Sequence, residues 1–157
     1  MARAGLRLRL SYVFCRANLS DFPRYVGWVA DRWPGTEICV SFVAPSTDLV
    51  PRTAALIPRY ADVVPPLAEG MRVARERGVR LSGFDSMCGV PLCLVPESLQ
   101  PYFELAEAPR DYAGGEVVDA AACGSCDLRG RCFGLRRGYA ELYGEGELTP
   151  VRRGERA

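Results

Sequence analysis

Three cysteines stand within ten residues in the run CGSCDLRGRC, which holds Cys123, Cys126 and Cys132. Two more, Cys88 and Cys93, belong to the run MCGVPLC. Thiolates separated by two residues can ligate one metal centre, because a tight turn brings both sulfurs to the same side. The spacing therefore predicts a centre held by Cys123, Cys126 and Cys132, with Cys93 or Cys88 as the fourth ligand.

Four thiolates can ligate either of two metal centres, a [4Fe–4S] cluster or a structural zinc ion. Zinc ribbons usually pair two CxxC motifs, whereas here the second pair is CxxxxC and a further cysteine follows the first pair after five residues. This irregular spacing favours the iron–sulfur cluster and keeps zinc as the alternative. Arg129 and Arg131 lie in the same run and could offset the charge of the centre, or could simply be solvated. Reduced thiols without a metal are the remaining interpretation.

Composition limits the class of protein. The chain has 157 residues, of which 48% are apolar, which suffices for one globular domain with a core. It has no apolar run of about 18 residues or more, and its amino end does not read as a secretory leader, so we expect a cytoplasmic protein. Cysteines in that compartment stay reduced, which favours metal binding over disulfides.

Missing residue types narrow the chemistry further. The chain has no histidine, which removes imidazole ligands and the usual acid–base side chain near neutral pH. All twenty basic residues are arginine, so no lysine is present for a Schiff base or a P-loop. The net charge of +1 and the scattered arginines are not typical of a nucleic-acid binder, and no membrane partner is expected.

The elements that must position the cysteines begin with strand, helix, strand. Alternating apolar residues over 6–14 predict the first strand, and a helix follows that Ser20 caps and Pro34-Gly35 stops. The nearly unbroken apolar run 37–43 predicts a strand covered on both faces. Cys39 falls in the second of these predicted strands and Cys15 stands at the end of the first, and we expect both to pack as small apolar side chains.

A second unit follows. We expect a helix from near Pro65-Pro66 to just before Gly78, since prolines are tolerated in a first helical turn, and then a strand over 79–84. Two such β-α-β units imply a parallel sheet with right-handed crossovers. From Asp85 onward the sequence predicts loops, a short helix over 97–103 and a final helix over 133–143.

With these elements placed, the chain resembles the C-terminal half of a radical S-adenosylmethionine (radical SAM) enzyme with an auxiliary iron–sulfur module of the SPASM/twitch type. The stretch SYVFCRANLSDFPRYVGWV is similar to the family's fourth barrel strand with its helix, ICVSFVAP to the fifth strand, and VRLSGFDSMCGVPLCLVPE to the sixth. The stretch CGSCDLRGRCFGLRRGYAELYGEGELTP is similar to the closing motif of the module. The similarity covers nearly the whole chain, and the closing motif is its most specific part.

The resemblance implies an α/β fold in three parts. A partial parallel (β/α) barrel of three strands would span 1–86, a small loop-rich, cysteine-ligated cluster module would span 87–150, and a disordered tail would span 151–157.

The resemblance also implies site residues. Cys123, Cys126 and Cys132 match ligands of an auxiliary [4Fe–4S] cluster, Cys93 is the preferred fourth ligand and Cys88 the next. The full SPASM pattern has one more cysteine after this run, which the sequence lacks, so we expect one auxiliary cluster at most. Asn18 matches a polar position near bound S-adenosylmethionine, although an asparagine there is more often a turn residue. No catalytic residue is assigned.

One departure from the family bears on activity. The CxxxCxxC loop that holds the SAM-cleaving cluster does not occur in the sequence. We therefore expect a truncated or split product that is inactive alone, or one subunit whose N-terminal half or partner chain completes the barrel and binds S-adenosylmethionine. The alternative function, from another class, is a non-catalytic Cys₄ zinc or iron–sulfur scaffold. The sequence does not indicate the substrate.

Overall fold

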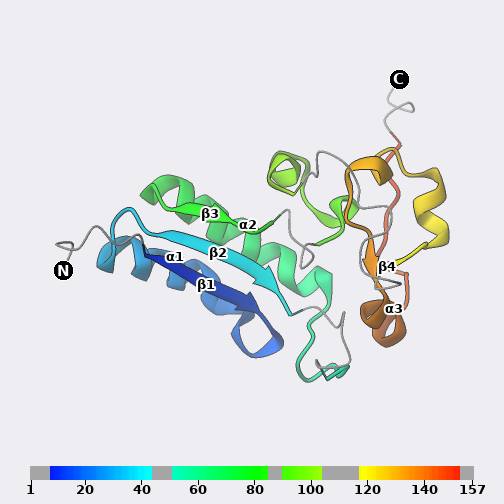
Figure 1. The fold of residues 1–157 in the computed structure, drawn as a ribbon, viewed down its shortest axis with the longest axis horizontal. Helices are drawn as coiled ribbons and strands as arrows, with labels where there is room; N and C mark the ends of the chain where they lie inside the picture. The colour runs from blue at the N-terminus through cyan, green and yellow to red at the C-terminus, as the bar shows by residue number, and fades with distance from the viewer. Residues whose placement is uncertain (1–7, 44–50, 85–89, 104–116, 153–157) are drawn as a thin grey trace.

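The computed structural model describes residues 8–43, 51–84, 90–103 and 117–152. Figure 1 shows a long molecule, with a sheet and two long helices toward the amino end and a group of short helices and strands toward the carboxyl end. Cys88 lies outside the described residues. The fold is mixed α/β, and its larger sheet is open rather than closed into a barrel.

Three parallel strands form the larger sheet, in the order β1 (Arg9–Phe14), β2 (Glu37–Phe42) and β3 (Arg80–Ser82). The register places Arg9 beside Glu37 and Glu37 beside Arg80, so the three strands begin level with one another. The predicted parallel sheet of two β-α-β units is therefore confirmed.

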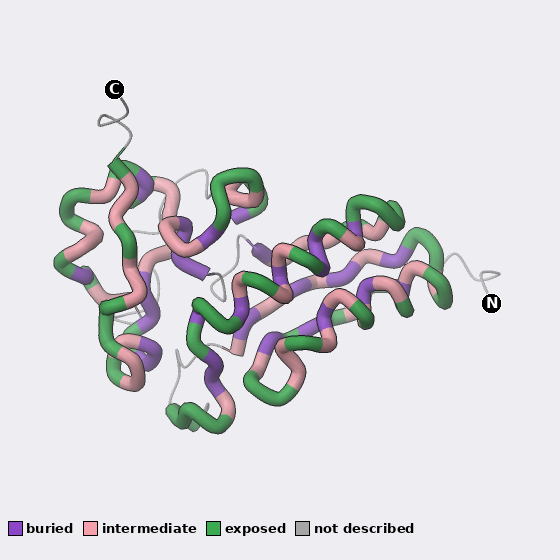
Figure 2. Tube along the Cα trace, turned by 180° about the vertical axis from the view of Figure 1, so that it is seen from behind, coloured by how far each residue is buried: buried purple, intermediate pink, exposed green. Residues whose placement is uncertain are grey.

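Helices α1 (Phe22–Arg32) and α2 (Tyr60–Arg77) cover one face of this sheet and pack against each other (Figures 1 and 2). Along β2, the buried side chains alternate with half-buried ones: Ile38, Val40 and Phe42 lie under the helices. The prediction that this strand is covered on both faces is wrong. Both crossovers pass on the same side of the sheet, so the other face has no helix among the described residues.

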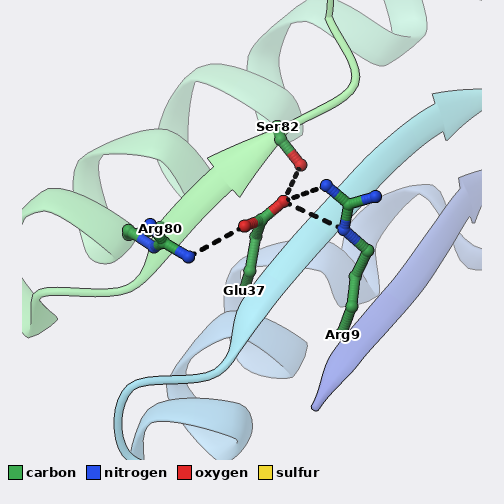
Figure 3. Close-up of polar contacts among 4 residues, drawn as sticks. All are labelled: Arg9, Glu37, Arg80 and Ser82. Carbon is green, nitrogen blue, oxygen red and sulfur yellow. Dashed lines mark hydrogen bonds and ion pairs between the residues drawn. The ribbon is translucent and has the colours of Figure 1, made fainter. Parts of the chain in front are cut away.

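That helix-free face carries a polar network at the amino ends of the strands (Figure 3). Glu37 accepts hydrogen bonds from Arg9 Nη2 at 2.6 Å, from Arg80 Nη2 at 2.9 Å and from Ser82 Oγ at 2.6 Å. One carboxylate from the central strand thus ties both neighbouring strands and holds the register.

The start of α1 differs from the prediction. A 3₁₀ helix, Arg16–Asp21, follows β1 and includes Ser20, so Asp21 rather than Ser20 is the N-cap residue, and Pro23 stands in the first turn. The predicted end of the helix, before Pro34-Gly35, is confirmed.

Helix α2 begins at Tyr60, several residues before the predicted start, so that Pro65 and Pro66 lie inside it. An internal proline costs about 3 kcal/mol, because it removes a backbone hydrogen bond and crowds the preceding turn. Burial of one face of the helix offsets this cost. The side chains on that face are Tyr60, Val63, Leu67, Met71 and Ala74.

The close packing of α1 on α2 depends on one glycine. A Cβ atom added at Gly70 would lie 2.2 Å from Cδ1 of the Phe22 ring, closer than any real contact. Phe22 is fully buried, so this ring fills the space that a larger residue at position 70 would need.

The carboxyl-terminal part is built from short elements. Six of them precede or form its small sheet: the 3₁₀ helices Leu92–Leu94, Glu97–Tyr102, Ala121–Ser125 and Arg129–Arg131, and the antiparallel pair β4 (Val117–Val118) and β5 (Leu135–Arg136). The short helix expected over 97–103 appears as the second of these 3₁₀ helices. Helix α3 is Arg137–Tyr143, shorter than predicted, because Gly134 has φ of +89° and β5 follows it.

Two further observations concern the ends and the surface. Val151 is the first residue of the predicted tail. Its carbonyl accepts a hydrogen bond from the Asp127 N–H, in the cysteine run, at 2.9 Å. The ordered chain therefore reaches at least Val151, and 153–157 lie outside the described residues. No helix in the described part of the chain has the length and apolar character needed to span a bilayer.

Candidate metal centre

The cysteines of the candidate site lie within or directly after three short 3₁₀ helices. Cys93 is the middle residue of Leu92–Leu94, Cys123 lies in Ala121–Ser125 and Cys126 follows it, and Cys132 follows Arg129–Arg131. All four are free, half-buried thiols. The Cys126 N–H donates to the Cys123 carbonyl at 3.2 Å, which is the tight turn expected between two cysteines separated by two residues.

These four sulfurs lie within range of one another's charge. The pKa of Cys93 is raised to about 11, mainly by burial and to a lesser extent by the charges of Cys132, Cys126 and Cys123. Burial is also the main cause of the raised pKa of Cys123, followed by the charges of Cys132 and Cys126. The fold thus brings to one neighbourhood a segment near residue 93 and a segment about thirty residues later in the chain.

Backbone amides point at three of the four sulfurs. The N–H groups of Leu92 and Gly134 both donate to Cys132 Sγ, each at 3.3 Å. The Val151 N–H donates to Cys126 Sγ at 3.4 Å.

Cys93 is the third sulfur with an amide donor. The backbone amide of Thr149 donates to it and lowers its pKa against the effect of burial. The pKa of Cys132 is likewise raised by burial and lowered by its two amide donors. Such donors stabilise the anionic form of sulfur, which is the form that binds a metal.

The four sulfurs are near one another but are not arranged as a complete set of metal ligands. Within the four described segments, no three Cys, Asp or Glu side chains are gathered as a group that could hold a metal ion. The donor set nevertheless fits a thiolate-bound centre in its chemistry: soft sulfur ligands, half-buried, with amides directed at them.

Two arginines lie in or beside the cysteine run, and one of them, Arg129, acts on a cysteine. Arg129 forms an ion pair with Asp119 at 2.7 Å and also lowers the pKa of Cys123, against burial and the neighbouring sulfurs. Arg136 is almost wholly buried, with 1% of its surface exposed, and its guanidinium lies over the ring of Phe133, the residue after Cys132. Sequence reasoning missed Arg136, since nothing in its spacing separates it from the other arginines.

Sequence reasoning also missed the residues that attach this part of the chain to α2. Tyr139 and Tyr60 stack with their ring centroids 3.9 Å apart, and the Tyr60 N–H donates to the Tyr139 hydroxyl at 2.9 Å. The Tyr143 hydroxyl donates to the Ile57 carbonyl at 2.6 Å, and Arg59 lies over the Tyr143 ring. The spacing of Tyr139 and Tyr143, one helical turn apart on α3, is the signal that could have indicated a shared contact face.

Asn18 lies apart from the clustered cysteines, in the first turn of the 3₁₀ helix Arg16–Asp21 that follows β1. Its side-chain oxygen accepts from the Cys15 N–H at 2.9 Å, and its side-chain nitrogen donates to the Val13 carbonyl at 2.9 Å. Both ends of the amide are thus engaged by the backbone at the entry of this helix, as expected for a turn or helix-entry residue.

The other two described cysteines differ from each other. Cys39 lies on the helix-free face of β2 rather than in the core, and its sulfur is 3.0 Å from the position of a Cβ added at Gly83. Cys15 is half-buried at the end of β1. The core packing expected for Cys39 is therefore wrong, because the alternation of β2 turns it away from the helices.

A small apolar cavity marks the carboxyl ends of the strands. Its volume is about 20 Å³, room for a water-sized molecule rather than for a cofactor. It is lined by residues that follow or end the strands, among them Phe14, Phe42, Gly83 and Phe84, and by Val90 and Phe103 from the carboxyl-terminal part.

No protein-family model, no curated protein and no solved structure matches this chain. The function is therefore inferred from the residues of the site themselves.

Proposed function

We propose that this chain is the C-terminal part of a radical SAM oxidoreductase or maturase, in which Cys93, Cys123, Cys126 and Cys132 hold an auxiliary [4Fe–4S] cluster. The observation that carries the proposal is the set of backbone amides directed at the sulfurs of Cys93, Cys126 and Cys132. Hydrogen bonds to ligand sulfurs are a main means by which proteins stabilise and tune such clusters.

The amide donors also favour Cys93 over Cys88 as the fourth ligand. Cys93 lies on the same 3₁₀ helix as Leu92, whose N–H donates to Cys132, so the fold places position 93 beside another proposed ligand. When bound, the cluster would bind substrate or pass electrons. The chain's own residues would hold it, shield it and supply the positive charge of Arg129 nearby.

The rest of the active enzyme would come from a partner. Strand β1 is an edge of the described sheet, and Val13 on it has 46% of its surface exposed. On the other side of β1, which α1 covers, Trp28 of α1 is 52% exposed and packs edge-on against Trp33, with ring centroids 4.6 Å apart. An open strand edge beside exposed aromatic rings suits a further strand and helix. The proposed partner supplies them together with the CxxxCxxC loop and the site for S-adenosylmethionine.

The second candidate function is a non-catalytic scaffold with zinc at the same four cysteines. The two amides on Cys132, one of them from Gly134 two residues later, also fit a zinc-bound thiolate. Both functions need the same ligands and differ in the metal.

Anaerobic reconstitution tests the proposal. We expect about four irons and four sulfides per chain and a broad absorbance near about 400 nm, as for a [4Fe–4S] cluster with four cysteine ligands. Cys93→Ser should lose the absorbance, whereas Cys88→Ser and the control Cys15→Ser should keep it. One tightly held, colourless zinc per chain would establish the scaffold instead, and no metal at all would contradict both functions.

The partner is tested separately. The chain is co-expressed with a polypeptide that carries a CxxxCxxC loop on a parallel β-α barrel half, and acrylamide quenching of tryptophan fluorescence is measured. A complex formed through β1 and α1 should protect Trp28 from the quencher, and Trp28→Glu should weaken it. A complex in which quenching is unchanged would place the interface elsewhere.

A further inference from the structure

Residues near the end of the described chain contact two of the segments that carry the proposed ligands, the one with Cys93 and the one with Cys123 and Cys126. We call residues 145–151, with the sequence EGELTPV, the C-terminal strap. Leu148 and Val151 of the strap pack against the hydrophobic core.

The acidic side chains of the strap accept hydrogen bonds from backbone amides in the first turns of two helices. Glu145 Oε2 accepts from the Ala121 N–H at 3.3 Å, at the start of the 3₁₀ helix that carries Cys123. Glu147 Oε1 accepts from the Ala61 N–H at 3.1 Å, in the first turn of α2. The first amides of a helix have no partner within the helix, so an acceptor from elsewhere in the chain satisfies them. At α2 a carboxylate also interacts favourably with the helix dipole.

Glu147 also contacts α2 indirectly, through Tyr139. Its Oε2 accepts from the Tyr139 hydroxyl, which in turn accepts from the Tyr60 N–H at 2.9 Å. The amides of the first two residues of α2 are therefore both satisfied by the carboxyl-terminal part of the chain. Burial and the Glu147 carboxylate raise the pKa of Tyr139, so its hydroxyl keeps the proton it donates.

The backbone of the strap serves the cysteines. The Thr149 amide donates to Cys93, and the Val151 amide donates to Cys126 at 3.4 Å. Pro150 between them has no N–H, so the donors are spaced by two residues, as on one side of an extended chain. The Val151 carbonyl also accepts from the Asp127 N–H at 2.9 Å, which fixes the strap against the cysteine run.

We infer that the C-terminal strap is a positioning element that locks the metal centre and couples it to the start of α2. The inference rests on the proposed function, since it takes Cys93 and Cys126 as ligands. Its carboxylates hold Ala61 and Ala121 while its amides hold two ligand sulfurs, so ordering of the sulfurs around a metal also orders the first turn of α2. That turn follows β2 and lies toward the carboxyl ends of the strands, where the small apolar cavity is found.

The first test removes one amide donor and keeps the rest of the strap. Val151→Pro deletes the N–H that donates to Cys126, and Val151→Ala, the matched control, keeps it. The affinity of the full chain for Zn²⁺, used as a probe for four thiolates, is measured anaerobically in competition with a chelator. Loss of a hydrogen bond to a ligand commonly costs about 10- to 100-fold in metal affinity, so we expect a loss of at least about tenfold for the proline variant alone.

The second test reads the coupling rather than the affinity. Hydrogen exchange is followed at the amides of Tyr60 and Ala61 with and without Zn²⁺. In the wild-type chain the metal should slow their exchange at least about fivefold, the lower range of coupling between sites. Glu147→Gln should abolish this response, and Glu69→Gln, a control on the exposed side of α2, should not.

The outcomes separate the two levels of the argument. A wild-type chain that takes up neither iron–sulfur nor zinc overturns the proposed function and this inference together. Normal metal binding with equal affinity in Val151→Pro and Val151→Ala, or with no metal-dependent protection of α2, overturns the strap and leaves the proposed function standing.

Discussion

Gly134 shows how much the cysteine site depends on single backbone positions. Its φ of +89° lies in the region that only glycine adopts at low cost, and its N–H is one of two that donate to Cys132. A Cβ added there would also lie 2.7 Å from Cγ1 of Val117 on β4. The donor, the bend and the packing of β4 on β5 therefore all depend on the absence of a side chain.

Gly134→Ala should weaken the proposed metal binding and lower the free energy of unfolding by about 1–2 kcal/mol, the cost of forcing a side chain into left-handed backbone. Gly130→Ala is the matched control, since nothing lies within 4 Å of the position of its added Cβ. Chelator competition and urea unfolding measure the two effects. Equal behaviour of the two variants would contradict the role given to Gly134.

At the scale of elements, α1 and α2 form a close pair over one face of the sheet. The contact of Gly70 with the ring of Phe22 sets how near the two helices come. Gly27 on α1 is a glycine of the opposite kind, with nothing within 4 Å of an added Cβ. The two helices therefore contain an internal comparison between a glycine needed for packing and one that is not.

We expect Gly70→Ala to destabilise the protein by about 1–3 kcal/mol, because an over-packed core must shift side chains or backbone. Gly27→Ala should instead stabilise it by up to about 1 kcal/mol through helix propensity. Thermal unfolding, monitored through the helix signal in circular dichroism at about 222 nm, measures the change in stability of both variants. A stabilising Gly70→Ala would mean that the helices do not touch at this position.

The polar network at the amino ends of the strands predicts a dependence on pH. Hydrogen bonds from Ser82 and Arg9 hold the pKa of Glu37 below its ordinary value of 4.5. A carboxyl whose pKa is lower in the folded state stabilises the fold above its unfolded pKa, and this contribution is lost as pH falls through the folded value.

Stability should therefore fall more steeply for the wild type than for Glu37→Gln as the pH drops from about 5 to about 3. Above pH 5 the wild type should be the more stable of the two. Glu76→Gln, which removes an exposed carboxylate on α2, controls for net charge. Parallel curves for wild type and Glu37→Gln would show that the carboxylate does not hold the strands together.

At the scale of the whole molecule, the sheet and the cysteine part meet through α3. Tyr139 and Tyr143 lie on the side of α3 that faces α2, and the Glu141 carboxylate forms an ion pair with Arg52 nearby. The buried Tyr60 N–H depends on the Tyr139 hydroxyl as its acceptor. We therefore expect the two parts to unfold as one cooperative unit.

Tyr139→Phe should cost about 1–3 kcal/mol, because it leaves a buried N–H without an acceptor, whereas Tyr102→Phe at an exposed position should cost little. Both tryptophans, Trp28 and Trp33, lie on or just after α1, so their fluorescence reports on the sheet part alone. In Tyr139→Phe, alkylation of the cysteines should begin at a lower urea concentration than the change in fluorescence. Coincident transitions in the variant would show that α3 is not the link.

The sequence predicted what periodicity and spacing encode. The parallel order of the three strands, the end of α1 before Pro34 and the neighbourhood of the clustered cysteines all follow from local patterns. The one-sided cover of β2 could not be predicted, because Cys39 and Ser41 are small enough to look like core residues.

The early start of α2 could not be predicted either, for a different reason. Its first amides are satisfied by Tyr139 and Glu147, about eighty residues away in sequence, and no local signal carries such a contact. The amides of Thr149, Val151 and Gly134 that point at sulfur are likewise invisible in a sequence, since every residue other than proline has a backbone N–H.

The position of the Thr149 and Val151 donors near the end of the described chain has a consequence for synthesis. Translation proceeds from the amino end, so every cysteine leaves the ribosome before these two residues do. A nascent chain therefore presents its thiols before their last two amide donors exist. A message truncated just upstream of Thr149 would yield a polypeptide with all seven cysteines and without the donors to Cys93 and Cys126.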